Sequence, residues 1–111
     1  MVRKIPENIY SGLPCSIVAV SCAKGELTMA TTRADGWMTL QGMNKFVRAN
    51  LPVKKYLYFK RGERTKLKNF IFTDNAVVMV LGHSIYVEGN TYYSFFDNSN
   101  DDVVAVWYLK E

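Results

Sequence analysis

The chain has 111 residues, a length that fits one domain, residues 1 to 111, around a single hydrophobic core. Apolar residues make up 49% of the chain and aromatic residues 14%, which excludes an intrinsically disordered protein. The formal net charge of +4 is only mildly basic, so it permits an acidic partner without requiring one.

The N-terminal third shows no convincing targeting signal. Arg3 and Lys4 precede a mildly apolar stretch from 9 to 23, and "AVSC" resembles a lipoprotein cleavage site. Pro6 and Pro14 interrupt this stretch, however, and its uninterrupted run "IVAV" is short for a signal sequence. No apolar run approaches the roughly 20 residues of a transmembrane helix, so no membrane span is expected.

The first predicted element is a helix over 14 to 25, after an extended segment. Pro14 suits a first helical turn, and Gly25 suits the end of a helix. The centre, "IVAV", is apolar on every side and predicts a helix that is buried all round. Its β-branched content leaves a buried strand as the alternative.

Two cysteines fall on this predicted helix. If Cys15 and Cys22 lie on one helix, their Cα atoms are about 10 Å apart, which is too far for a disulfide. Two reduced thiols favour a reducing compartment, and we therefore expect a cytoplasmic protein.

The rest of the chain predicts one more helix and then a sheet. Residues 26 to 37 read as irregular, and 61 to 70 as a turn with a short helix. A helix is predicted over 39 to 52, with an apolar stripe that Pro52 ends. Strands are predicted at 53–60, 77–81, 83–87, 92–96 and 103–108. The expected fold is α+β, with two helices packed on a four- to five-stranded antiparallel sheet.

Cys15 has a position that suits a nucleophile. The N–H groups of a first helical turn and the positive end of the helix dipole favour thiolate over thiol. The same N–H groups suit an oxyanion. Cys15 is therefore the candidate nucleophile.

His83, the only histidine, is the candidate base. Gly89-Asn90 predicts a hairpin whose arms bring position 83 about opposite 96. Asp97 is then expected beside His83, where it orients the imidazole ring, and Asn98 is the alternative orienter. A cysteine and a histidine oriented by Asp or Asn follow the logic of a catalytic triad.

At "LPCSIVAVSCA", "VLGHSIYVEGNTYY" and "FFDNS" the chain resembles the papain-like cysteine peptidases. It is similar in particular to the short bacterial or phage type, such as the double-glycine leader peptidases. The resemblance implies a minimal papain-like fold and a cysteine peptidase that cleaves peptide or isopeptide bonds through an acyl-enzyme. It assigns the nucleophile to Cys15, the base to His83 and the orienter to Asp97, with no cofactor. Where the family has an oxyanion-binding Gln, this chain has Ile9, and Asn8 is the nearest amide.

Simpler interpretations stand beside these assignments. Buried cysteines are usually packing residues, which is the favoured interpretation of Cys22. Asp97 lies in "DNSNDD", which is also a good turn sequence. Trp107 is a core or rim residue, with packing against His83 as a weaker possibility that the resemblance suggests. One histidine and two cysteines on one helix do not make a zinc site, so no metal is expected.

A basic, aromatic segment supports a different class of function. Residues 53–68 hold half of all Lys and Arg, together with Tyr56, Tyr58 and Phe59. The alternative is a non-catalytic binding module, or an inactive papain-like fold, that uses this segment against nucleic acid or an acidic protein. The small net charge and the lack of a nucleic-acid motif argue against nucleic acid, and lysines also protect an exposed strand edge.

Overall fold

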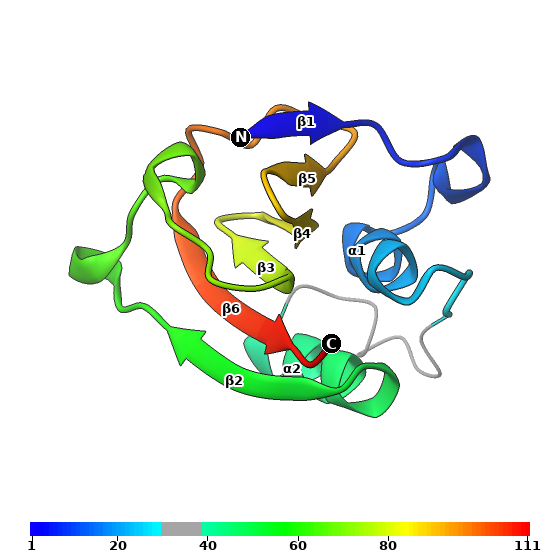
Figure 1. The fold of residues 1–111 in the computed structure, drawn as a ribbon, viewed down its shortest axis with the longest axis horizontal. Helices are drawn as coiled ribbons and strands as arrows, with labels where there is room; N and C mark the ends of the chain where they lie inside the picture. Colours follow the sequence, from blue (N-terminus) through cyan, green and yellow to red (C-terminus); the bar gives the residue numbers. More distant parts are fainter. Residues whose placement is uncertain (30–38) are drawn as a thin grey trace.

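The computed structural model describes residues 1–29 and 39–111, whose elements are shown in Figure 1. Within these ranges the elements are β1 (Val2–Lys4), η1 (Asn8–Tyr10), α1 (Cys15–Lys24), α2 (Leu40–Asn50), β2 (Val53–Tyr58), η2 (Arg61–Glu63), η3 (Leu67–Asn69), β3 (Ala76–Val80), β4 (His83–Glu88), β5 (Thr91–Tyr93) and β6 (Val103–Leu109). The three η elements are single turns of 3-10 helix. Residues 26–29 are irregular, as predicted, and most of the predicted irregular segment lies outside the described residues.

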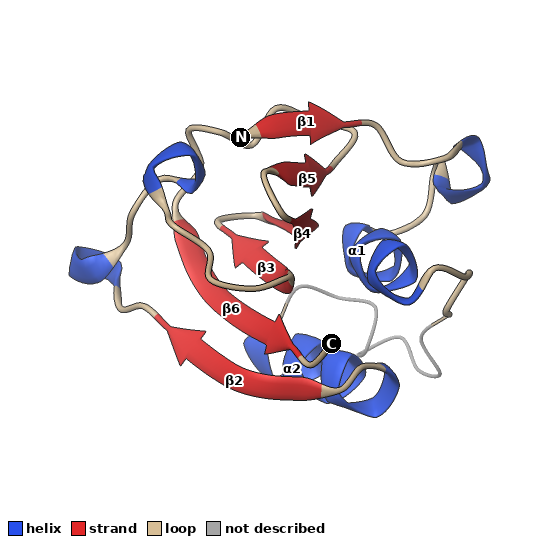
Figure 2. Cartoon of the chain, in the orientation of Figure 1, coloured by secondary structure: helices blue, strands red, loops and turns tan. Residues whose placement is uncertain are grey.

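The strands form one sheet in the order β1-β5-β4-β3-β6-β2 (Figure 2). The pairs β2–β6, β3–β4, β3–β6 and β4–β5 are antiparallel, whereas β1 pairs with β5 in parallel. The predicted α+β class is confirmed, but the expected antiparallel sheet of four or five strands is wrong, because the sheet is mixed and has six strands. The side chains of β1 are all exposed, so no apolar alternation marked this strand in the sequence.

Both α-helices share one hydrophobic cluster with the sheet. Ile17 and Val20 of α1 and Met43 and Val47 of α2 are buried in the same cluster as Trp107 of β6. The helix predicted over 14–25 is confirmed as α1, and Gly25 ends it with a left-handed φ of 81°. The helix predicted over 39–52 is confirmed as α2, where the Thr39 hydroxyl accepts the N–H of Gly42 as an N-cap.

The other face of the sheet is also covered. Leu67 of η3 packs there with Val78, Ile85 and Val106, and Phe59, Phe70 and Phe72 lie partly buried around them. The central strands β3 and β6 are therefore buried along their whole length. Burial on both faces explains why these strands read as continuous apolar runs.

The predicted strands of the C-terminal third are present, with one difference that matters for the site. The strand expected at 92–96 ends at Tyr93 in β5, and the chain then leaves the sheet. Within the described residues, neither α-helix has the length and apolar character that crossing a bilayer requires.

One hydrogen bond ties α2 to the sheet and predicts a stability effect. The indole N–H of Trp107, which is fully buried, donates to Oδ1 of Asn44 at 2.9 Å. Asn44→Ala should lower the free energy of unfolding by about 1–3 kcal/mol, because the buried N–H loses its acceptor. Urea denaturation measures this loss. Lys45→Ala, at the next and exposed position, is the control and should stay within about 0.5 kcal/mol of wild type. Equal effects of the two substitutions would contradict the prediction.

Candidate functional site

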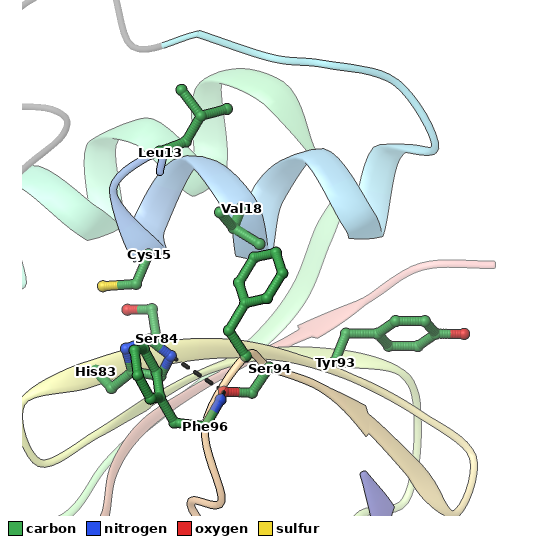
Figure 3. Close-up of a pocket in the computed structure, with 9 residues that line it drawn as sticks. Leu13, Cys15, Val18, His83, Ser84, Tyr93, Ser94 and Phe96 are labelled. Atoms are coloured by element: carbon green, nitrogen blue, oxygen red, sulfur yellow. Dashed lines mark hydrogen bonds between the residues drawn. The ribbon is translucent and has the colours of Figure 1, made fainter. Parts of the chain in front are cut away.

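A small pocket lies between the start of α1 and the end of the β4–β5 hairpin (Figure 3). Its volume is about 180 Å³. The pocket is lined by Leu13, Cys15, Val18, His83, Ser84, Tyr93, Ser94, Phe95 and Phe96. Cys15 and His83, the predicted nucleophile and the predicted base, thus line one pocket although they are far apart in the sequence.

Cys15 is the first residue of α1 and is partly buried. Burial raises the pKa of its thiol above the ordinary value, and hydrogen bonding from the backbone N–H groups of Ser84, Ser16 and Cys15 itself opposes this effect. The first-turn N–H groups of Cys15 and Ser16 therefore lower the pKa of the thiol, as expected from the sequence, but burial has the larger effect and the net shift is upward. The desolvation of the charged form outweighs the surrounding donors.

His83 is the first residue of β4 and follows Gly82, whose φ of 82° is a left-handed conformation that favours glycine. Burial lowers the pKa of the imidazole, and the nearby charge of Asp101 opposes this shift. The ring is therefore neutral at pH 7. The rings of His83 and Phe96 meet edge to face, with centroids 5.5 Å apart.

A series of polar side chains lies behind the imidazole. Nε2 of His83 is 3.2 Å from the hydroxyl of Ser94. That hydroxyl donates to Oδ1 of Asn98 at 2.5 Å, and Nδ2 of Asn98 donates to the Asp101 carboxylate at 2.8 Å. Ser94 and Asn98 are both buried. Asn98, the alternative orienter, thus reaches the ring through Ser94 rather than directly.

Asp97 does not orient His83, which corrects the expected assignment. Its carboxylate is exposed and accepts from the hydroxyl of Tyr92 at 3.2 Å and from the N–H and hydroxyl of Ser99 at 3.0 and 2.7 Å. These bonds, led by that of the Ser99 hydroxyl, hold the pKa of Asp97 below its ordinary value. Asp97 is a turn residue that binds the backbone two positions ahead, as the simpler interpretation of "DNSNDD" held.

The register of the hairpin explains why Ser94 takes this place. Tyr86 lies opposite Tyr93 and Val87 opposite Tyr92, and the pairing ends there. Opposite residues share a face and neighbours alternate, so Ser94, the residue directly after β5, lies on the face of Ile85 and His83. This parity was present in the sequence and would have pointed to Ser94.

Asn8, the candidate oxyanion donor, and Trp107, the suggested packing partner of His83, do not line the pocket. Asn8 lies in η1, is exposed and is not among the residues that line the pocket, so its amide is not brought to Cys15. Trp107 is buried in the core, where its ring lies 5.3 Å from that of Tyr56. Phe96, and not Trp107, packs against the imidazole.

Cys22 lies two turns further along α1, beside a different pocket that includes Tyr10 and Glu88. Burial raises the pKa of its thiol to about 11, with the charge of Glu7 adding to the shift. Neither cysteine forms a disulfide in the structure. Cys22 therefore serves as an internal reference for Cys15, on the same helix but away from His83.

Among residues 1–29 and 39–111, no group of three or more His, Cys, Asp or Glu side chains is arranged to hold a metal ion. Comparison with protein-family models, curated proteins and solved structures finds no match for this chain.

The two raised thiol pKa values predict how the cysteines respond to pH. Only the thiolate reacts with iodoacetamide, so both cysteines should react slowly at neutral pH. The rate for Cys22 should rise about tenfold per pH unit up to about pH 10, because its pKa is about 11. The rate for Cys15 should also keep rising above the ordinary thiol pKa of about 8.5.

Peptide mass spectrometry measures both rates, and the urea-unfolded protein gives the reference rate for each thiol. A rate for Cys15 that is already high and constant in mild acid would contradict the prediction. It would indicate a preformed thiolate–imidazolium pair instead of two neutral groups.

Proposed function

We propose that this protein is a cysteine hydrolase of minimal papain-like type that cleaves a peptide or isopeptide bond. The observation that carries the proposal is that Cys15 and His83 line one pocket, while the imidazole is held from behind by Ser94. A thiol and an imidazole at one pocket are the nucleophile and the base that catalysis by cysteine needs. No cofactor enters the proposed reaction.

In the proposed first step the Cys15 sulfur attacks the substrate carbonyl carbon. The thiol proton passes to the ring nitrogen of His83 that Ser94 does not bind, and the carbonyl π electrons move to the oxygen. Collapse of this intermediate breaks the C–N bond, and His83 returns the proton to the leaving amine. Water, deprotonated by His83, then hydrolyses the thioester and restores the thiol.

Neutral resting groups suit this sequence of proton transfers. Burial raises the pKa of Cys15 and lowers that of His83, so the proton stays on sulfur until a substrate arrives. His83 then acts as a general base during the attack, rather than as the partner of a standing ion pair. A neutral imidazole at pH 7 is the protonation state that a base requires.

Backbone donors can replace the missing glutamine of the oxyanion site. The N–H groups of Cys15, Ser16 and Ser84 act on the Cys15 sulfur and lower its pKa against the effect of burial. Donors directed at this sulfur are near the oxygen of a carbonyl that the sulfur attacks. We assign the oxyanion to these backbone groups and not to Asn8.

The arrangement of elements agrees with the family resemblance in its central part. A buried helix opens with the cysteine and packs on the strand that the histidine begins, as in papain-like enzymes. The six-stranded mixed sheet and the role of Ser94 depart from the expected pattern. The pocket that Cys15 and His83 line together is the observation that supports the proposed family assignment.

The basic segment supports the binding-module alternative less well. Strand β2 forms one edge of the sheet, and Lys54 and Lys55 are exposed on it. Lys54 pairs with Asp74 at 2.9 Å, and the Lys60 N–H is capped by Glu63 at 3.2 Å. Exposed lysines on an edge strand prevent edge-to-edge pairing, which accounts for their presence without a ligand.

Acyl transfer to Cys15 tests the proposal without knowledge of the natural substrate. The protein is mixed with p-nitrophenyl acetate at pH 7.5, quenched, and examined by mass spectrometry. The acetyl group should appear on Cys15 during turnover. His83→Ala should slow this acylation by about 100-fold or more, because the thiol loses its base.

Cys22→Ala is the matched control and should leave the acylation rate unchanged, whereas Cys15→Ala should abolish it. A peptide library, compared between wild type and Cys15→Ala, then identifies cleavage sites. Acylation that is equal at Cys15 and Cys22, or that is indifferent to His83→Ala, would reject the proposed function.

A further inference from the structure

The polar side chains behind His83 form a hydrogen-bonded series with a single consistent direction. The series runs from the Asp101 carboxylate through Asn98 and Ser94 to Nε2 of His83, with distances of 2.8, 2.5 and 3.2 Å. Ser94 and Asn98 are 2% and 4% exposed, so water is largely kept from both. Figure 3 shows the Ser94 end of this series meeting the imidazole on the side away from Cys15.

Asp101 sets the orientation of the Asn98 amide. An ionised carboxylate only accepts hydrogen bonds, so the group that faces Asp101 at 2.8 Å must be the NH₂ of Asn98. A flipped amide would bring two acceptor oxygens together. Oδ1 of Asn98 therefore faces Ser94 and has to be an acceptor.

The hydrogen bonds of Ser94 determine which ring nitrogen of His83 carries the proton. A hydroxyl has one proton and two lone pairs, and the Ser94 proton is used in the bond to Asn98. One lone pair accepts the backbone N–H of Phe96 at 3.1 Å. The remaining lone pair faces Nε2 of His83, and that nitrogen has to carry a proton. In a neutral imidazole the other nitrogen, Nδ1, is then unprotonated.

We propose that Ser94, Asn98 and Asp101 are positioning residues that hold His83 as the Nε2–H tautomer and leave Nδ1 as the basic nitrogen toward Cys15. The role of Nδ1 as the base rests on the proposed cysteine hydrolase function, but the tautomer does not. In Figure 3 the ring nitrogen that Ser94 does not bind is drawn on the same side of the ring as the Cys15 sulfur, with the Ser84 side chain between the thiol and the ring. Phe96 restrains the same ring edge to face, which limits its rotation.

The series also gives Asp101 an influence on a ring that it does not touch. The charge of Asp101 opposes the lowering of the His83 pKa by burial. Asp101 also orients the Asn98 amide, and the amide oxygen in turn accepts the proton of the Ser94 hydroxyl. Asp97, by contrast, bonds only to Tyr92 and Ser99 among the described residues. The two aspartates, four positions apart, therefore form a matched pair for a test.

Long-range ¹H–¹⁵N correlation spectra give a direct readout, because His83 is the only histidine in the chain. Two-bond correlations to the ring protons distinguish the two neutral tautomers. In wild type at pH 8 the spectrum should show Nε2–H with unprotonated Nδ1. A wild-type spectrum of the Nδ1–H tautomer, or of an equal mixture, would overturn the proposal without any variant.

Variants test which residues maintain the tautomer. Ser94→Ala should produce a mixture, and Asp101→Ala should shift the population in the same direction because the amide loses its orientation. Ser94→Thr keeps the hydroxyl and should restore the wild-type pattern. Asp97→Ala is the control and should leave the tautomer unchanged. If the tautomer shifts in Asp97→Ala but not in Ser94→Ala or Asp101→Ala, then Asp97 is the residue that positions His83 and the inference is overturned. Backbone amide spectra show whether each variant is folded.

The acylation assay separates this inference from the proposed function. Ser94→Ala should reduce acylation of Cys15 by roughly tenfold or more, as removal of an orienting partner does for other functional histidines. A wild-type Nε2–H tautomer without acylation of Cys15 would reject the hydrolase and keep the positioning role. Acylation that needs Cys15 and His83, with tautomer and rate unchanged in Ser94→Ala, would keep the hydrolase and reject the positioning role.

Discussion

The packing of α1 against β4 is the constraint on which the pocket depends. Ile17, Ala19 and Val20 of α1 share a buried cluster with Tyr86 of β4 and Val77 of β3, and this fixes the helix over the sheet. The first residue of the helix is Cys15 and the first residue of the strand is His83. Burial of these aliphatic side chains thus brings the starts of α1 and β4 together, and Cys15 and His83 both line the pocket there. The free energy for this comes from apolar contact, and the polar groups at the pocket gain their positions from it.

The same burial determines the charge state of the pair. Desolvation penalises a thiolate and an imidazolium alike, which moves the pKa of Cys15 up and that of His83 down. The helix start and the backbone donors reduce this penalty without removing it. The site therefore rests as thiol and neutral imidazole, and charge would develop only when the sulfur bonds to a substrate. At a partly buried site, fixed donors stabilise such developing charge more strongly than they would in water.

The turn after β5 supplies the polar support of the imidazole. The strand ends at Tyr93, and the chain folds back so that Ser94, Asn98 and Asp101 follow one another through hydrogen bonds. Tyr92 links this turn to the strand, because its hydroxyl accepts the N–H of Asn98 and donates to Asp97. The two carboxylates of the turn have separate tasks: Asp97 closes the turn through Ser99, and Asp101 orients the Asn98 amide. Sequence spacing alone had given the orienting task to Asp97.

The sequence by itself determined the α+β class, the two helices and the central strands, because local signals agreed with burial. Pro14 and Gly25 bounded α1, the apolar stripe and Pro52 bounded α2, and the continuous apolar runs of β3 and β6 reflected strands covered on both faces. It also singled out Cys15 and His83, since a helix start and a strand start are readable locally. Only the tertiary structure decided the parallel edge strand β1, the early end of β5 and the partner of the imidazole. These features depend on backbone pairing between distant segments and on hydrogen bonds within a turn, and such interactions leave no periodic pattern in the amino-acid sequence.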